Sequence, residues 1–465
     1  MRGNLRLLAD SGKRIANLGT QGSLVIVVLL IVLPAALTSV PVAVVCASAL
    51  VITTMALIVG LGRTGSGLLV VAFATAPLDS LRAIGPFSVA LSDLLFVAGF
   101  VVLIPRLAAT TLHLPKAFLF GGIGLLTVGS LSALASDQPG YNSYRLVFVA
   151  SGVVLLPVLL TWWQPGHRTT IAAAAAYTFG NTVSVAACLF EDPYMEGRYA
   201  GLTTHPNVFG LCQTLSIALA PFLLEAAPRR YRWIVCVGFL ISAYGIWISG
   251  SRAALLSAVA LTLLYPLFRR SIPAALVVAA LCLPAIVVVN RVAQNPDPSN
   301  ALGRLLGGAP QSDEYRRAGA QTAVDQFLSH PLIGDGWESV WLVHNVYLQV
   351  AAAIGMLGLV CFLFVLASIL RPLIAVPRPY GLLAAPGLAA AMLGAVDPAL
   401  GNRYIWCVVA LALSADRLVA LAEEPSDQVS NSAVAPRPEP SVASNKETSV
   451  ASNKEMGVAL WGRSH

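Results

Sequence analysis

The stretch that organises this chain spans residues 315–358 and reads YRRAGAQTAVDQFLSHPLIGDGWESVWLVHNVYLQVAAAIGMLG. It begins on a polar segment that carries the paired arginines Arg316 and Arg317. A glycine-rich turn follows at 334–336, and His344 then stands at the start of a long apolar run. Arginine suits phosphate through its bidentate fork, and histidine titrates near neutral pH. The stretch therefore indicates part of an active site for a pyrophosphate-linked substrate, at a membrane surface.

The composition places most of the chain in lipid. Of 465 residues, 57% are hydrophobic and only 11% are charged, with a mean hydropathy of +0.76. Soluble proteins carry roughly 25% charged residues, so we expect the lipid bilayer, and not nucleic acid, as a partner. The seven cysteines all lie in apolar runs, which is typical of packing residues. The sequence has no CxxC or HxxxH spacing, so we predict no structural metal site. We also expect no cofactor.

The apolar runs predict an all-α polytopic membrane protein with about 12–14 transmembrane helices, since a helix needs ~20 residues to cross lipid. The run at 66–78 is short for a span. The runs lie at roughly 23–40, 41–61, 66–78, 93–112, 117–135, 144–163, 169–190, 207–226, 233–249, 253–268, 272–290, 343–370, 380–396 and 404–421.

We divide the chain into five parts on this pattern. They are a cytoplasmic basic tail at 1–21, a transmembrane bundle at 22–290, a large outer loop at 291–343, further transmembrane helices at 344–422 and a polar tail at 423–465. The polar tail holds the tandem repeat SVASNKET and SVASNKEM, and it has too few aromatic residues to bury a core. We expect this tail to be disordered and cytoplasmic.

The lysines and arginines set the predicted orientation. With the N-terminus inside, the short cytoplasmic segments receive more basic residues than the outer ones, as the positive-inside rule requires. Several of the outer arginines cluster in three loops. Under this topology the outer face holds Arg198, His205, Arg252, Arg316, Arg317, His330 and His344.

A helix is predicted within the large outer loop, over 313–329. One face of it would carry Arg316, Ala320, Ala323, Phe327 and Leu328, and another Arg317, Gln321 and Asp325. We expect an amphipathic helix that lies on the membrane surface.

Each candidate residue also has a structural interpretation. Arg198 precedes Thr203, Thr204 and Pro206, a pattern typical of a helix start, and an isolated outer arginine is most often simply solvated. Arg252 lies between two spans joined by almost no loop, where it would either reach lipid headgroups or clamp an anion. His344 would either cap the next helix or act as a general base.

Residues 195–370 resemble the O-antigen ligase and O-antigen polymerase family. The resemblance rests on short motifs that occur in the same order along the chain. They are Arg198-x-x-Gly201 with Pro206-Asn207-x-x-Gly210, Ser251-Arg252, His330-Pro331-Leu332-x-Gly334-x-Gly336, and His344-Asn345-x-Tyr347-Leu348-Gln349 with Gly355-x-x-Gly358.

The resemblance implies a GT-C-like, metal-independent glycosyltransferase on the outer face of the bacterial cytoplasmic membrane. A base on the side opposite the leaving diphosphate would favour inversion at the anomeric carbon, so we expect an inverting enzyme. Such an enzyme passes a glycan from an undecaprenyl-diphosphate carrier to a hydroxyl of a glycan or lipid-glycan acceptor. Arg198 and Arg252 would bind the donor diphosphate, and His344 would orient or deprotonate the acceptor. The further residues that would bind substrate are Arg316, Arg317, Asn207, Asn345 and His330.

Other functions stay open at this point. The motifs are shared by ligases and polymerases, so either activity fits. A transporter or flippase for a lipid-linked glycan or small anion could use the same arginines for binding alone, although we find neither inverted repeats nor a carboxylate in the middle of an apolar run. A scaffold without catalytic activity would leave the outer motifs without a role.

Overall fold

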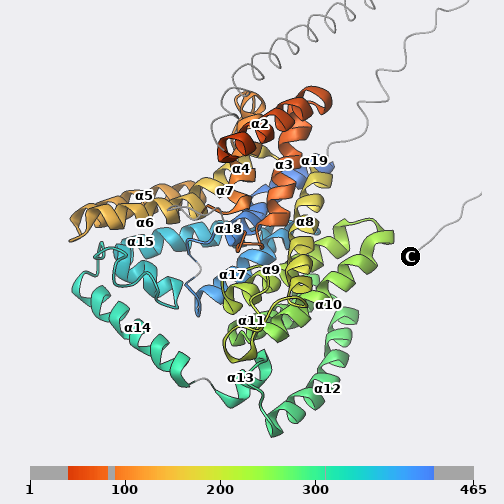
Figure 1. The fold of residues 1–465 in the computed structure, drawn as a ribbon, viewed down its shortest axis with the longest axis vertical. Helices are drawn as coiled ribbons and strands as arrows, with labels where there is room; N and C mark the ends of the chain where they lie inside the picture. The colour runs from red at the N-terminus through yellow and green to blue at the C-terminus, as the bar shows by residue number, and fades with distance from the viewer. Residues whose placement is uncertain (1–39, 82–88, 309, 399, 424–465) are drawn as a thin grey trace, which may run out of the picture. The chain divides into compact units, whose positions relative to one another are not determined.

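The computed structural model describes residues 40–81, 89–308, 310–398 and 400–423, and helices are the regular elements of these ranges (Figure 1). The fold class predicted from the sequence is confirmed. The main helices are α2 (Val40–Val59), α3 (Leu61–Thr75), α4 (Leu91–Leu107), α5 (Lys116–Ala135), α6 (Pro139–Ala150), α7 (Leu156–Trp163), α8 (His167–Ala187), α9 (Pro206–Ala226), α10 (Arg232–Ser249), α11 (Arg252–Arg269), α12 (Ile272–Gln294), α13 (Ala301–Gly307), α14 (Pro310–Ser329), α15 (Val346–Leu370), α16 (Pro372–Ala375), α17 (Ala385–Gly394), α18 (Arg403–Ala410) and α19 (Ala415–Glu423).

Eight of the described helices are long and apolar enough to cross a membrane, fewer than the 12–14 expected. Two features contribute to the difference. Some predicted runs form shorter apolar helices, such as Leu61–Thr75 and Tyr380–Gly394. The run at 23–40 lies almost wholly outside the described residues, as do the basic tail at 1–21 and the polar tail from 424 on. The chain is a multi-pass membrane protein by these helices.

Helix α9 forms the centre of the bundle, and α12 lies at its edge. About 78% of the apolar window of α9 is buried, against 6% for α12. Helices α8, α10, α11 and α17 pack around α9, whereas α12 packs mainly against α11 and α13. Figure 1 shows α12, α13 and α14 following one another along the edge of the bundle. Nearly the whole apolar surface of α12 is therefore free to contact lipid.

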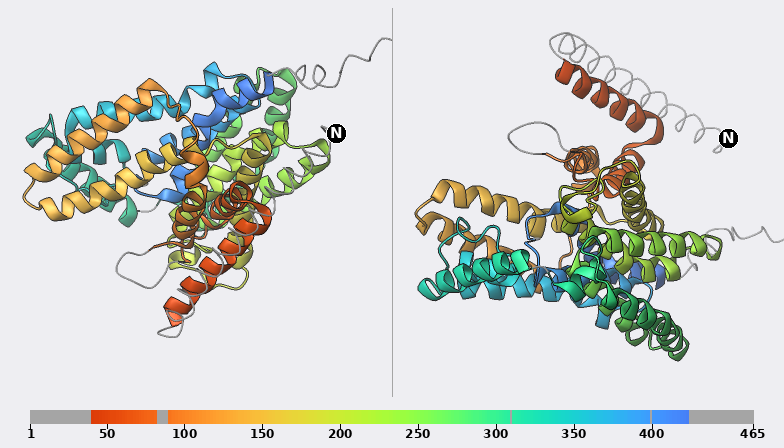
Figure 2. Two further views of the ribbon diagram at one scale, coloured as in Figure 1. Left: turned by 90° about the horizontal axis from the view of Figure 1, so that it is seen from above. Right: turned by 60° about the horizontal axis from the view of Figure 1, so that its bottom comes forward.

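Helices α5, α6 and α15 form a second group that runs side by side (Figure 2). Helix α15 is broken in its middle, where Ile354 (φ −131°, ψ 16°) and Gly355 (φ 71°, ψ −175°) leave helical geometry. Glycine is required at 355 by two constraints. Its φ lies in the left-handed region, and a Cβ there would lie 2.2 Å from the carbonyl oxygen of Leu332.

The loop at 331–336 packs into this break through its backbone. The N–H groups of Met356 and Leu357 donate to the carbonyls of Pro331 (2.8 Å) and Leu332 (3.3 Å). In return, the N–H groups of 335 and 336 donate to the carbonyls of 352 (3.2 Å) and 353 (2.9 Å). In an unbroken helix these four groups of α15 would bond to one another. The His-Pro-Leu and Gly-x-x-Gly motifs thus form one interlocked unit.

The chain between this loop and His344 is also fixed from several sides. The Gln349 side chain donates to the carbonyls of Val340 (3.2 Å) and Trp341 (2.7 Å). The Arg145 guanidinium lies 4.2 Å from the centre of the Trp341 ring, a favourable cation–π contact. These contacts determine where His344 emerges at the start of α15.

Helix α14 confirms the helix predicted over 313–329 and extends it to Pro310–Ser329. Its two faces differ largely as expected, because Ala323 is buried and Arg316 half-buried, while Arg317, Gln321 and Asp325 are exposed. The prediction was wrong for Leu328, which is 68% exposed and does not belong to the buried face.

The orientation stays a prediction, which cysteine labelling can test. Gln311 is exposed at the start of α14 and suits this purpose. With all native cysteines replaced, Gln311→Cys should react with a membrane-impermeant maleimide added outside intact spheroplasts, since the charge bias places 291–343 outside. The control is Arg229→Cys, in the exposed segment just after the C-terminal end of α9, which the charge bias places inside. It should react only after lysis. The reverse pattern would invert the topology.

Candidate functional site

Several helix ends meet on one side of the bundle. Helices α9, α11 and α15 all begin there, with N-caps His205, Ser251 and Asn345, whose side chains accept backbone N–H groups. The N-terminus of a helix carries partial positive charge, and backbone N–H groups at such ends bind anions. The arrangement therefore favours a negatively charged ligand.

Arg198 lies in the loop before α9 and is only 7% exposed. Its Nε donates to the carbonyl of Ser249 (2.9 Å) and its Nη2 to the Asn207 side-chain oxygen (2.7 Å). A Cβ at Gly250 would lie 2.7 Å from Arg198 Nε, so only glycine lets the side chain pass. Both hydrogen-bond partners are neutral. Burial, together with the charges of Arg316 and Arg252, lowers the pKa of Arg198 to about 10.

Two further arginines reach the same region, and each forms an ion pair with a carboxylate. Arg252, the first residue of α11, makes a bidentate pair with Asp313 of α14, and its side chain is 17% exposed. Arg304 of α13 pairs with Glu196, which lies close to Arg198 in sequence. Burial and the charge of Arg316 lower the pKa of Arg304, while Asp313 opposes this shift. The pair between Arg252 and Asp313 also ties α14 to the start of α11.

Arg316 lies close to all of these charged groups. It is near enough to Arg198, Arg304, His205 and His344 to lower the pKa of each. Burial, and then the charge of Arg252, lower its own pKa. Its Nε is buried without a hydrogen-bond partner among the described residues. A buried, unsatisfied guanidinium N–H is costly, and a phosphate oxygen would satisfy it.

Asp397, in the loop between α17 and α18, is near enough to Arg316 for the two charges to interact. Burial raises its pKa to about 6, and the charge of Arg316 counteracts the rise. Asp397 is 8% exposed. In its ionised form it balances part of the charge of Arg316. With Glu196 and Asp313 it makes three carboxyl groups against the four arginines, so basic groups outnumber acidic ones in the cluster.

His205 and His344 both lie in this cluster, and both are neutral at pH 7. Burial, then Arg198, His344 and Arg316, lower the pKa of His205 to about 4. Its Nδ1 accepts the N–H of Asn207 (3.1 Å), so that lone pair is engaged in capping α9. His205 is therefore a cap, and its other ring nitrogen carries the proton.

His344 differs from His205 in what its ring does. Burial and the charge of Arg316 lower its pKa, and a hydrogen bond to the backbone of Leu342 opposes that shift. Such a bond favours protonation because a ring N–H donates to the carbonyl. In the neutral ring the other nitrogen carries a lone pair, the form that a general base requires. The Tyr315 ring lies edge-on at 5.9 Å between ring centres.

The remaining candidates from the sequence are placed less centrally. Asn207 contacts Arg198, and Asn345 caps α15 by accepting the N–H of Leu348 (3.0 Å). Arg317 is exposed on α14, about 100° around the helix from Arg316. His330 is exposed beside Ser329, and its ring lies 4.0 Å from Asp335. The structure thus joins Arg198, Arg252, Arg316, His344 and Asn207, and leaves Arg317 and His330 at the surface.

Sequence reasoning missed the acidic partners. Glu196 lies two residues before the Arg198 motif, Asp313 three before Arg316, and Asp397 just beyond the predicted 380–396 run. The signal for Asp397 was available: an Asp-Pro pair interrupts an apolar segment there, and such carboxylates are rare and functional. In the described ranges, no group of three or more His, Cys, Asp or Glu is arranged to hold a metal ion.

Comparison with protein families supports one assignment. Residues 237–363 match the family model described as O-antigen ligase. The match runs from α10 into α15 and includes Arg252, Arg316 and His344. It confirms the resemblance seen in the sequence, and the chain is a multi-pass membrane protein with a domain of the O-antigen ligase family. A comparison with curated proteins gave no match.

The cluster should bind pyrophosphate, with Arg252 as a main contact. Arg252→Ala should weaken pyrophosphate binding by about tenfold or more, because a charged hydrogen bond contributes about 1.5–3 kcal/mol. Arg252→Lys should restore little, since lysine lacks the fork. Asp313→Asn should strengthen binding, because the phosphate no longer has to displace a carboxylate. Isothermal titration calorimetry on purified protein measures all three.

The matched control is Arg291→Ala, which removes an exposed arginine from the end of α12. It should leave the affinity unchanged. An equal loss in Arg291→Ala and Arg252→Ala would mean that only net charge matters, and the cluster would not be an anion site.

Proposed function

We propose that this protein is an inverting glycosyltransferase that moves a glycan from an undecaprenyl-diphosphate donor to an acceptor hydroxyl. The acceptor belongs to a glycan or lipid-linked glycan, and the reaction takes place on the outer face of the bacterial cytoplasmic membrane. The observation that carries the proposal is the meeting of buried arginines, three helix N-termini and a neutral histidine at one end of a membrane bundle.

The donor diphosphate would bind among Arg198, Arg252 and Arg316. As the glycosidic bond breaks, the electron pair goes to the diphosphate oxygen, and negative charge grows there. Fixed cations in a partly desolvated site stabilise such charge at no cost in reorganisation. The unpartnered Nε of Arg316 and the fork of Arg252 supply donors for phosphate oxygens. Because the arginines supply the positive charge, we infer that the reaction is metal-independent.

His344 would take the proton from the acceptor. The acceptor oxygen forms a bond to the anomeric carbon, the bond from that carbon to the diphosphate oxygen breaks, and the hydroxyl proton passes to the free ring nitrogen of His344. His205 is unsuited to this step, because its Nδ1 is engaged with Asn207. A base that faces the leaving group across the sugar favours inversion of configuration.

The placement of the site at the membrane surface suits a lipid carrier. Arg252 is the first residue of a candidate membrane span, and His344 precedes another by two residues. The polyprenyl chain of the donor would stay in the bilayer while its diphosphate reaches the arginines. This division of one substrate between lipid and water explains why the site lies at the ends of membrane helices.

His344→Ala tests the proposed mechanism. It should lower the rate of glycan transfer by about 10²–10⁴-fold, the usual contribution of a general base. Donor affinity should stay within about twofold of wild type, because the diphosphate contacts are arginines. Both quantities are measured on the same purified protein, reconstituted with a lipid-diphosphate glycan and an acceptor. His113→Ala removes an exposed histidine between α4 and α5 and serves as the control.

Two results would contradict the mechanism. Transfer at the wild-type rate by His344→Ala would reduce the histidine to a structural residue. If wild-type protein instead moved the lipid-linked glycan across the bilayer without forming a new glycosidic bond, the transporter alternative would hold.

A further inference from the structure

A second basic pocket lies at the opposite end of α11 from the candidate site. Arg252 begins this helix of 18 residues and Arg269 ends it, so the two ends are about 26 Å apart at 1.5 Å per residue. That length is close to the hydrocarbon thickness of a bilayer, about 30 Å. We therefore expect the two regions at opposite membrane faces, where a ligand of one would not reach the other.

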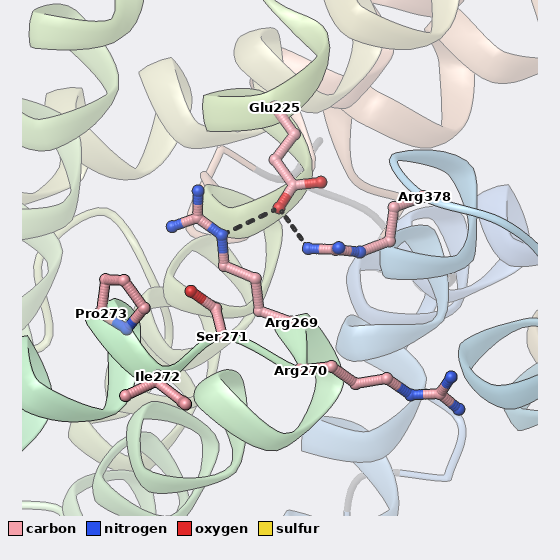
Figure 3. Close-up of a pocket in the computed structure, with 7 residues that line it drawn as sticks. All are labelled: Glu225, Arg269, Arg270, Ser271, Ile272, Pro273 and Arg378. Carbon is pink, nitrogen blue, oxygen red and sulfur yellow. Dashed lines mark hydrogen bonds and ion pairs between the residues drawn. The ribbon is translucent and has the colours of Figure 1, made fainter. Parts of the chain in front are cut away.

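The pocket is an open surface hollow of about 660 Å³ and is lined by residues from three separate segments (Figure 3). Arg269 and Arg270 come from the end of α11, Glu225 from the end of α9, and Arg378 from the segment after α16. Figure 3 shows Arg269 and Arg378 directed toward Glu225. Three arginines against one carboxylate leave an excess of positive charge around the hollow.

The ion pairs of the pocket leave its arginines available. Glu225 Oε1 accepts from Arg378 Nη1 at 3.2 Å and lies 3.7 Å from Arg269 Nε. One carboxylate oxygen is thus shared by two guanidinium groups, each of which keeps further N–H donors. Arg270 is exposed, and its φ of +48° is uncommon for a residue other than glycine. This conformation turns the chain between α11 and α12 and brings Ser271 into the pocket wall.

The surroundings of the pocket are strongly apolar. Helix α12 starts beside it at Ile272, which is 78% exposed, and Leu276 and Val277 continue an exposed apolar surface along the helix. Leu267 extends the same character onto α11. A phosphate held by the arginines would therefore have hydrocarbon-facing helix surface directly next to it.

We propose that this pocket binds the phosphate headgroup of an anionic membrane lipid, whose acyl chains lie along α12. Cations beside an exposed apolar span are the arrangement that selects such lipids, and each nearby arginine adds attraction to an anionic headgroup. Arginine forks also match phosphate oxygens in geometry. The lipid would fill the space beside α12, a helix that the protein itself hardly covers.

The binding of lipids to the purified full-length protein tests this site. Native mass spectrometry compares phosphatidylglycerol with phosphatidylcholine of the same acyl chains, which carries a phosphate but no net charge. Phosphatidylglycerol should bind more tightly. Arg270→Ala and Arg378→Ala should each weaken its binding about fivefold. Glu225→Gln should strengthen it, because a competing carboxylate is lost. Arg229→Ala, an exposed arginine near the end of α9, is the control and should change nothing.

Three outcomes would contradict the proposal. Equal binding of the two lipids would remove the headgroup preference. An equal loss in Arg229→Ala would show attraction to net charge and not a pocket. If millimolar inorganic phosphate displaced the lipid signal from wild type and bound with the same arginine dependence, the ligand would be free phosphate. Thermal unfolding of each variant verifies that it folds, and none of these results depends on glycan transfer.

Discussion

The break in α15 at Ile354 and Gly355 frees backbone groups in a buried part of a membrane helix. An unsatisfied buried group costs about 1–3 kcal/mol, so these groups need partners from elsewhere in the chain. The 331–336 loop supplies them, and the carbonyl of Ala353 also accepts the Ser132 hydroxyl at 2.6 Å. Because this loop is fixed in the break and Gln349 fixes the chain at residues 340 and 341, His344 is held at a defined place.

Close packing and specific polar contacts also hold the arginines of the candidate site in place. Arg198 is buried because Gly250 leaves room for it and Ser249 and Asn207 satisfy its N–H groups. Arg316 reaches the cluster because α14 is tied to α11 by the Arg252–Asp313 pair. Desolvation lowers the pKa of Arg198 and of Arg316, which means that their charged forms are stabilised less in the folded protein than they would be in water. An anionic substrate offsets that loss, so empty and loaded sites differ in stability.

The sequence predicted the helices well and the site only in part. Apolar runs and helix bounds agree closely, as in 207–226 against Pro206–Ala226, because lipid requires long apolar helices. The basic residues of the site were found through short motifs. Their acidic partners were not, since Arg252 and Asp313 are 61 residues apart and nothing local links them. Local patterns also could not show that Gln349 and Gly355 position a loop, because such roles exist only once distant segments pack together.

The most direct measurement is the position of the diphosphate in a cryo-electron microscopy structure with a non-hydrolysable donor lipid. We predict that its phosphates lie between Arg252 and Arg316, within hydrogen-bond distance of both, with Asp313 moved away from the Arg252 fork. The free ring nitrogen of His344 should face the anomeric carbon from the side opposite the diphosphate. A diphosphate bound away from these arginines, with the Arg252–Asp313 pair intact, would contradict the proposed site.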